Sequence, residues 1–173
     1  VFFSDDGSTA VEVALKMCMQ YWRNRGDDNR SAFLSLDHAY HGDTSGAMSV
    51  SADSPFTTAF ASMRFSVFRG HSAYCLHCPV GLKRESCDIE CLNRMRAILG
   101  QHGKNIAAII VEPMVQAAGG MIIHPVEYLR RIRDLATQFD IPLIADEVFT
   151  GFGRTGAMFA CELAGIVPDI MCL

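Results

Sequence analysis

The stretch IPLIADE, residues 141–147, combines a short apolar run with two carboxylates at its end. Its apolar residues predict a buried strand that ends at Asp146. A carboxylate that is buried with such a strand is costly unless a cationic or hydrogen-bond-donating group meets it. The identity of the group that meets Asp146 is therefore the first question that the sequence raises.

The segments around this stretch alternate between strand and helix patterns. Four apolar segments predict strands, at residues 31–36, 106–111, 141–145 and 169–173. Three segments with apolar residues at helical spacing predict helices, at residues 9–23, 88–102 and 125–139. Thr9 and Glu12 have the spacing of a capping box, which favours a helix start at Thr9. Buried strands joined by helical crossovers predict an α/β fold with a mostly parallel sheet.

Composition and charge exclude several classes of function. The chain has 173 residues, of which 50% are hydrophobic and 20% charged, and a formal net charge of −4. Without a basic run or a basic–aromatic stripe, nucleic acid and anionic membranes are poor partners. The apolar stretches are shorter than the roughly 18 residues of a membrane helix. Seven cysteines, an odd number, favour a reducing cytoplasm and hence a cytoplasmic protein.

The two ends of the sequence indicate an internal piece of a longer fold. The chain starts at Val1 on a strand-like VFF and stops at Leu173 after an apolar run. Chain termini usually lie at the surface of a domain, in polar segments. We therefore expect residues 1–173 to be part of a larger domain.

Polar residues cluster where the predicted strands end. HAYHGD (38–43), VEP (111–113) and ADE (145–147) each follow a strand, and SDDGST (4–9) leads into a helix. In parallel sheets, ligands bind beyond the carboxyl ends of the strands. Together the four segments predict one site at that edge of the sheet.

Each polar residue also has a simpler interpretation. Gly7 and Ser8 at a helix start suit a phosphate group, or they simply cap the helix. Asp146 suits a protonated pyridine nitrogen, a metal ion or an ion pair with Arg154. Tyr40 offers an aromatic surface for a flat ring, or is a half-buried loop tyrosine. The residues by themselves leave these alternatives open.

Four cysteines form a separate pattern. Cys75, Cys78, Cys87 and Cys91 have a spacing that suits a tetrahedral zinc ion. The alternative is that Cys91 packs as a free thiol in the helix predicted from residue 88. We retain zinc as a hypothesis.

Four segments of the chain resemble class III pyridoxal-phosphate aminotransferases. They are DDGSTAVEVALKMC (5–18), YHGDTSGAMSV (40–50), VEPMVQAAGGM (111–121) and ADEVFTGFGRTGAMFACELAGIVPDIMCL (145–173). The resemblance covers most of the chain, in the same order, apart from about residues 70–92. It implies the large coenzyme-binding domain of a fold-type I transferase, here incomplete, in a homodimer that acts on small molecules.

The resemblance also implies a role for individual coenzyme-site residues. Gly7 and Ser8 match residues that hold the phosphate of pyridoxal 5'-phosphate, and Tyr40 matches an aromatic residue that stacks on its ring and borders the substrate. Asp146 matches the partner of the ring nitrogen, and Val148 matches an aliphatic residue on the other face of the ring. Glu112 matches an acid in the coenzyme site.

Two further positions indicate the branch of the family. Asp43 is similar to the biotin-pathway branch, and Arg154 is expected to pair with it near the substrate. That branch implies S-adenosylmethionine, or lysine in some relatives, as amino donor. It implies 8-amino-7-oxononanoate as acceptor and 7,8-diaminononanoate as product. A class III ω-amino-acid:pyruvate aminotransferase is the alternative within the family.

The catalytic lysine of the family has no counterpart in the sequence. In the family this Schiff-base lysine follows a PDI strand, and here the sequence ends at Leu173, just after that motif. Residues 1–173 alone are therefore expected not to transaminate. A non-catalytic scaffold, in which the cysteines bind metal, is the alternative from a different functional class.

Overall fold

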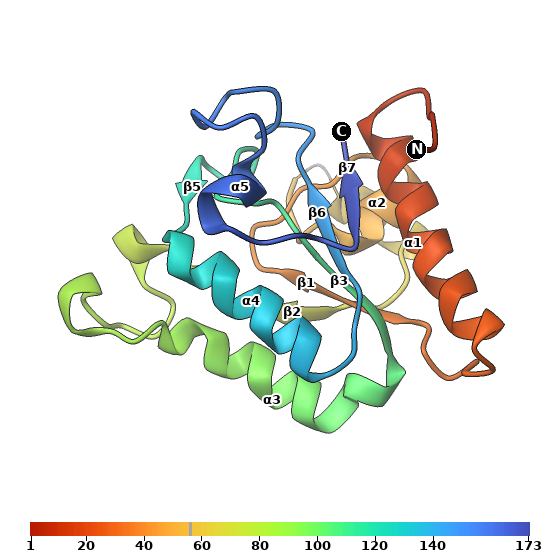
Figure 1. Ribbon diagram of the computed structural model, residues 1–173, viewed down its shortest axis with the longest axis horizontal. Helices are drawn as coiled ribbons and strands as arrows, with labels where there is room; N and C mark the ends of the chain where they lie inside the picture. Colours follow the sequence, from red (N-terminus) through yellow and green to blue (C-terminus); the bar gives the residue numbers. More distant parts are fainter. Residues whose placement is uncertain (56) are drawn as a thin grey trace.

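The computed structural model describes residues 1–55 and 57–173. It contains a five-stranded parallel sheet in the order β2-β1-β3-β6-β7 and a separate antiparallel pair, β4 and β5 (Figure 1). The strands of the sheet are β1 (Ala32–Leu36), β2 (Phe68–Gly70), β3 (Ile106–Val111), β6 (Leu143–Asp146) and β7 (Ile170–Cys172). The pair consists of β4 (Val115–Gln116) and β5 (Ile122–Ile123). The expected α/β fold with a mostly parallel sheet is confirmed.

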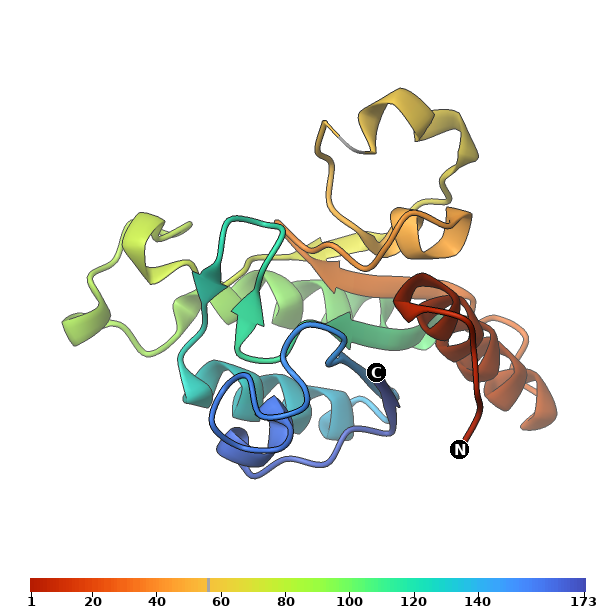
Figure 2. The same ribbon diagram turned by 90° about the horizontal axis from the view of Figure 1, so that it is seen from above.

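Helices cover both faces of the sheet. The α-helices are α1 (Gly7–Asn24), α2 (Ser45–Val50), α3 (Asn93–His102), α4 (Val126–Gln138) and α5 (Ala160–Ala164). The 3₁₀ helices are η1 (Thr58–Met63), η2 (Cys75–His77), η3 (Arg84–Ser86), η4 (Glu90–Leu92) and η5 (Gly103–Asn105). One apolar core lies between the sheet and α3, α4 and α5, and a second lies between the sheet and α1 and α2 (Figures 1 and 2).

The central strands owe their burial to this two-sided cover. All six residues of β3 and all four of β6 are buried. Such strands form continuous apolar runs because neither face meets water. Among the described residues, no helix combines the length and apolarity needed to cross a membrane.

The first helix starts earlier than its sequence pattern predicts. α1 begins at Gly7, and its capping box consists of Asp6 and Thr9. The Asp6 carboxylate accepts the Thr9 N–H at 2.8 Å, while the Thr9 hydroxyl accepts the Asp6 N–H at 3.0 Å. Glu12 therefore does not cap α1, and its carboxylate instead accepts N–H groups at the start of α2.

The helix expected from residue 88 begins later. Ile89 has a φ of 61°, in the left-handed region, and α3 starts only at Asn93 after the short turn η4. Leu92 and Cys91 in this turn are buried against the core, which fixes the chain before the helix starts. The segment between residues 71 and 92 extends to one side of the molecule (Figures 1 and 2).

Candidate functional site

A cavity of about 370 Å³ lies beyond the carboxyl ends of β1, β3 and β6, at the start of α1. Its walls are Asp6, Gly7, Ser8, Tyr40, His41, Gly42, Glu112, Ala117, Ala118, Asp146, Val148 and Phe149. The four polar segments of the sequence therefore meet at one place, at the edge of the sheet where ligands of α/β proteins bind.

Asp146 meets His41 in this cavity. Its Oδ2 lies 2.7 Å from Nδ1 of His41, and its Oδ1 accepts the N–H of Val148 at 3.2 Å. The Asp146 residue is 6% exposed and the His41 side chain is fully buried. Because an ionised carboxylate only accepts hydrogen bonds, the proton of this pair belongs on Nδ1 of His41. The pair answers the question that the strand end raises.

Arg154 lies elsewhere. Its Nε donates to the carbonyl oxygen of Phe149 and its guanidinium lies 4.6 Å from the Phe149 ring centroid. Asp43 instead accepts a hydrogen bond from the Tyr40 hydroxyl at 3.0 Å. The ion pair between Arg154 and Asp43 is therefore not formed, and neither residue belongs to the cavity walls. Their roles in substrate binding stay predictions.

Glu112 holds the loop that carries Tyr40. One carboxylate oxygen accepts the Tyr40 N–H at 2.9 Å and the other accepts the Ala117 N–H at 3.2 Å. Burial raises the pKa of this carboxyl to about 7, although the positive potential of His41 and the two N–H groups oppose the shift. Burial and the hydrogen bond to Asp43 raise the pKa of Tyr40.

The start of α1 forms another wall of the cavity, through Asp6, Gly7 and Ser8. The first N–H groups of a helix have no partner within the helix, and the positive end of the dipole points outward. Gly42 touches this helix start: its φ is +122°, and an added Cβ would lie 2.2 Å from the Ser8 hydroxyl oxygen. An added Cβ on Gly7 would lie 2.9 Å from Val148. The segments that carry Gly42, Ser8 and Val148 therefore pack closely at the edge of the cavity, with no room for a larger side chain at either glycine.

Glu147, next to Asp146, has a different role. It is fully buried and accepts three hydrogen bonds of 2.8 Å, from the Thr150 hydroxyl and from the N–H groups of Ala160 and Cys161. These contacts hold the start of α5 against the end of β6. Glu147 therefore supports the fold, while Asp146 faces the cavity.

The cysteine pattern does not give the expected metal site. Cys75, Cys78, Cys87 and Cys91 do line one narrow cavity, and all four are free thiols. Yet among residues 1–55 and 57–173, no group of three or more His, Cys, Asp or Glu side chains is arranged to hold a metal ion. Burial raises the pKa of the Cys91 thiol to about 11. The zinc hypothesis is therefore not supported.

His41 is the site residue that the sequence motifs did not identify. It is adjacent to Tyr40, but its partner Asp146 lies 105 residues away. The only available signal was that both residues follow predicted parallel strands, whose carboxyl ends meet at one edge of the sheet.

The chain resembles known aminotransferases along its whole length. The protein-family model "Aminotransferase class-III" matches residues 1–173. The adenosylmethionine-8-amino-7-oxononanoate aminotransferase of Geobacter sulfurreducens is 48% identical over 174 residues, which are 100% of this chain and 38% of the relative. The chain thus spans less than half the length of this relative.

Solved structures agree with the sequence comparison. An amine transaminase from an uncultivated Pseudomonas species, in a PLP-bound form, superposes with a TM-score of 0.91 at 36% identity, over 97% of this chain and 38% of that one. The adenosylmethionine-8-amino-7-oxononanoate aminotransferase of Methanocaldococcus jannaschii gives 0.85 at 37% identity, over 97% and 36%. Since the family match runs from the first residue to the last, the chain belongs to the class III aminotransferases.

Proposed function

We propose that the protein containing this chain is a pyridoxal-phosphate-dependent aminotransferase of biotin synthesis. It transfers the amino group of S-adenosylmethionine to 8-amino-7-oxononanoate and gives 7,8-diaminononanoate. The observation that carries the proposal is the buried Asp146 carboxylate, which is paired with His41 and faces a cavity that opens at the start of α1. The names of three curated relatives, which are 42–48% identical to this chain, support the choice of substrates.

The described residues fit pyridoxal 5'-phosphate. The cavity of about 370 Å³ lies in the range of small-molecule sites. Gly7 and Ser8 at the start of α1 suit the phosphate, Tyr40 and Val148 suit the two faces of a flat ring, and Asp146 suits its nitrogen. When bound, this coenzyme supplies a pyridinium ring that withdraws electrons from the substrate carbon that loses a proton.

Asp146 provides the charge that this chemistry requires. A carboxylate in a buried site interacts strongly with a positive charge because little water screens it. It therefore holds a proton on the ring nitrogen. His41 donates to the other side of the carboxylate and fixes its orientation, and Glu112 fixes the main chain of Tyr40.

Residues 1–173 supply part of the coenzyme-binding large domain in this proposal. The coenzyme lysine, the small domain and the second subunit of a homodimer belong to the rest of the assembly. The three lysines of the chain support this division, since Lys16, Lys83 and Lys104 are not among the cavity walls. Residues 1–173 alone are accordingly expected to be inactive.

The proposal is tested with Asp146→Asn in the full-length protein. Turnover of 8-amino-7-oxononanoate is expected to fall at least about a hundredfold, because a neutral amide does not stabilise the ring charge. The exposed Asp134 on α4 offers a matched control, and Asp134→Asn should leave turnover unchanged. Unaltered turnover and an unaltered coenzyme spectrum in Asp146→Asn would overturn the proposal.

A second candidate within the family is an ω-amino-acid:pyruvate aminotransferase. The observation that favours it is the TM-score of 0.91 with an amine transaminase, against 0.85 with the biotin-pathway enzyme of M. jannaschii. Parallel assays separate the candidates: 8-amino-7-oxononanoate with S-adenosylmethionine or lysine as donor, and pyruvate with a β-amino acid. Turnover in the pyruvate assay alone would favour the second candidate.

A further inference from the structure

The short helix α2 is held at its start by a carboxylate from α1. Oε1 of Glu12 accepts the N–H groups of Gly46 and Ala47, at 2.5 and 3.3 Å. These N–H groups have no partner within the helix, and Thr44 at the N-cap makes no side-chain capping bond. Gly46 allows the close approach, since an added Cβ would lie 2.3 Å from Oε2 of Glu12. Glu12 therefore replaces an ordinary cap.

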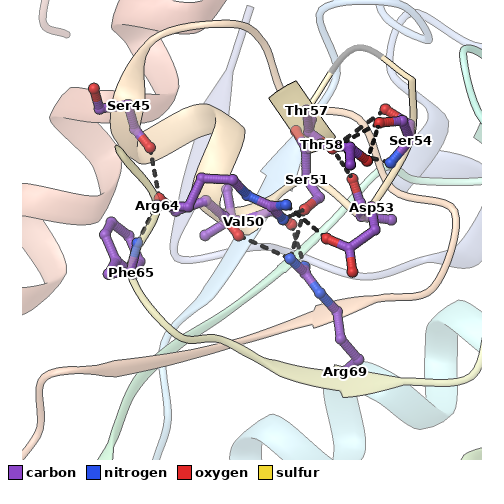
Figure 3. Close-up of polar contacts among 12 residues, drawn as sticks. Ser45, Val50, Ser51, Asp53, Ser54, Thr57, Thr58, Arg64, Phe65 and Arg69 are labelled. Atoms are coloured by element: carbon purple, nitrogen blue, oxygen red, sulfur yellow. Dashed lines mark hydrogen bonds and ion pairs between the residues drawn. The ribbon is translucent and has the colours of Figure 1, made fainter. Parts of the chain in front are cut away.

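The end of α2 is held by two guanidinium groups (Figure 3). Arg69 on β2 donates to the carbonyl oxygens of Ser49, Val50 and Ser51, at 2.8, 2.5 and 2.5 Å. Arg64 adds a hydrogen bond of 2.7 Å to the Ser51 carbonyl. Burial and the repulsion by Arg64 lower the pKa of Arg69 to about 10. The carbonyls thus take the place of the water that this cation has lost.

The residue at the end of α2 connects these contacts to the cavity. The Ser51 hydroxyl donates to the Ala47 carbonyl at 2.9 Å and accepts the main-chain N–H of His41 at 2.8 Å. His41 in turn contacts Asp146 through its ring, at 2.7 Å. A continuous series of hydrogen bonds therefore leads from Arg69 through Ser51 and His41 to Asp146.

We propose that Glu12 and Arg69 are positioning residues that hold the His41–Asp146 pair in place through α2. Neither side chain is among the walls of the cavity, so each acts only through the helix. A six-residue helix is unstable by itself, because nucleation costs more than so few hydrogen bonds return. Its position, and with it that of Ser51 and His41, depends on groups that hold both ends. The consequence for the coenzyme rests on the function proposed above.

Arginine is required at position 69 because of its shape. The planar guanidinium has five N–H donors in a fixed arrangement, and here two of its nitrogens reach three carbonyl oxygens. A lysine ammonium is a compact charge on a flexible chain and does not reproduce this geometry. Arg69→Lys is therefore expected to retain the charge and only part of the positioning.

The experiment uses the full-length protein with ¹⁵N-labelled histidine. In the coenzyme-free state, the Nδ1–H resonance of His41, assigned with His41→Gln, reports the hydrogen bond to Asp146. Arg69→Met is expected to shift or broaden this resonance, and Arg69→Lys to restore it in part. In a separate titration, Arg69→Met is expected to bind pyridoxal phosphate about tenfold more weakly, as for the loss of one good hydrogen bond.

Arg130 offers a matched control. Its Nε donates to the Ala164 carbonyl at 2.8 Å, so it also holds the end of a short helix. The start of that helix donates to Glu147, which does not line the cavity, whereas Ser51 at the end of α2 accepts the N–H of the cavity residue His41. Arg130→Met should lower the melting temperature without changing the His41 resonance or the coenzyme affinity. If Arg69→Met does not fold, Glu12→Met at the other end of α2, which removes the acceptor oxygen, is measured in the same way.

The outcomes separate this inference from the proposed function. An unchanged His41 resonance in folded Arg69→Met or Glu12→Met, with parental coenzyme affinity, overturns the positioning role and leaves the function standing. A parent protein that binds no pyridoxal phosphate overturns the function, while the resonance still tests the contact between α2 and the His41–Asp146 pair.

Discussion

At the scale of single residues, Glu112 makes stability depend on pH. Its carboxyl is 6% exposed, and burial raises its pKa from 4.5 to about 7. A raised pKa in the folded state means that the protonated form is favoured there. The contribution of protonated Glu112 to the free energy of unfolding is therefore fully present below pH 4.5. It is lost as the pH rises to about 7.

Glu112→Gln should therefore remove the contribution of this carboxyl to the pH dependence of stability, because an amide does not titrate in this range. At low pH the variant loses the hydrogen bond at one N–H, because an amide nitrogen is not an acceptor. Between pH 4.5 and 7 it should gain stability relative to the parent protein, since it has no charge to bury. Melting temperatures of the coenzyme-free full-length protein, taken for the parent and the variant at each pH, measure this difference in stability. A stability difference between variant and parent that stays constant from pH 4.5 to 7 would contradict the raised pKa of Glu112.

At the scale of elements, the contact between the Gly42 loop and the start of α1 shapes the cavity proposed to bind the coenzyme. Gly42 has a φ of +122°, and an added Cβ would lie 2.2 Å from the Ser8 hydroxyl. Gly42→Ala should therefore both strain the backbone, by about 1–3 kcal/mol, and displace Ser8 from the cavity wall. We expect weaker binding of pyridoxal phosphate by the full-length protein, measured by titration.

Gly26 provides the matched control for this substitution. Its φ is +80°, and nothing lies within 4 Å of an added Cβ. Gly26→Ala should therefore lower stability through backbone strain alone and leave coenzyme affinity unchanged. Equal affinities of the two alanine variants would show that the contact between Gly42 and Ser8 does not matter for binding.

The elements also show what the sequence could predict. Strand β3 is a continuous apolar run, and so is β6 up to Ala145, so their pattern identifies them directly. β2 has only three residues and α2 only six, too few for a periodic pattern, so both lie in segments without a predicted element. The pattern predicts too early a start for α3, because the left-handed turn at Ile89 interrupts an otherwise helical spacing of apolar residues.

The candidate site also has parts that the sequence predicts and parts that it does not. Asp146 and Tyr40 were placed at one edge of the sheet because parallel strands end there. The pairing of Asp146 with His41, and the contact of Glu12 with α2, join residues that are 105 and 34 positions apart. Such contacts depend on how the helices pack on the sheet, and no local pattern encodes them. The same holds for Arg154, whose contact with Phe149 differs from the expected ion pair.

At the scale of the whole molecule, the parallel sheet gathers the residues proposed to bind the coenzyme, and no lysine is among them. The chain has three lysines, none of which lines the cavity. Lys16 is exposed on α1, and Lys83 and Lys104 are exposed near the 3₁₀ helices η3 and η5. A lysine that bonds to the coenzyme would have to reach into the cavity that Asp146 lines. None of these three side chains is placed to do so.

The full-length protein should therefore tolerate replacement of all three lysines. The triple variant Lys16→Arg, Lys83→Arg, Lys104→Arg keeps the net charge, and we expect its turnover to stay within about twofold of the parent, the size of an ordinary surface effect. Reduction of the coenzyme-loaded protein with borohydride, followed by peptide mapping, should place the modified lysine outside residues 1–173. A modified peptide that contains Lys16, Lys83 or Lys104 would contradict this, because it would require a cavity different from the one between β6 and α1.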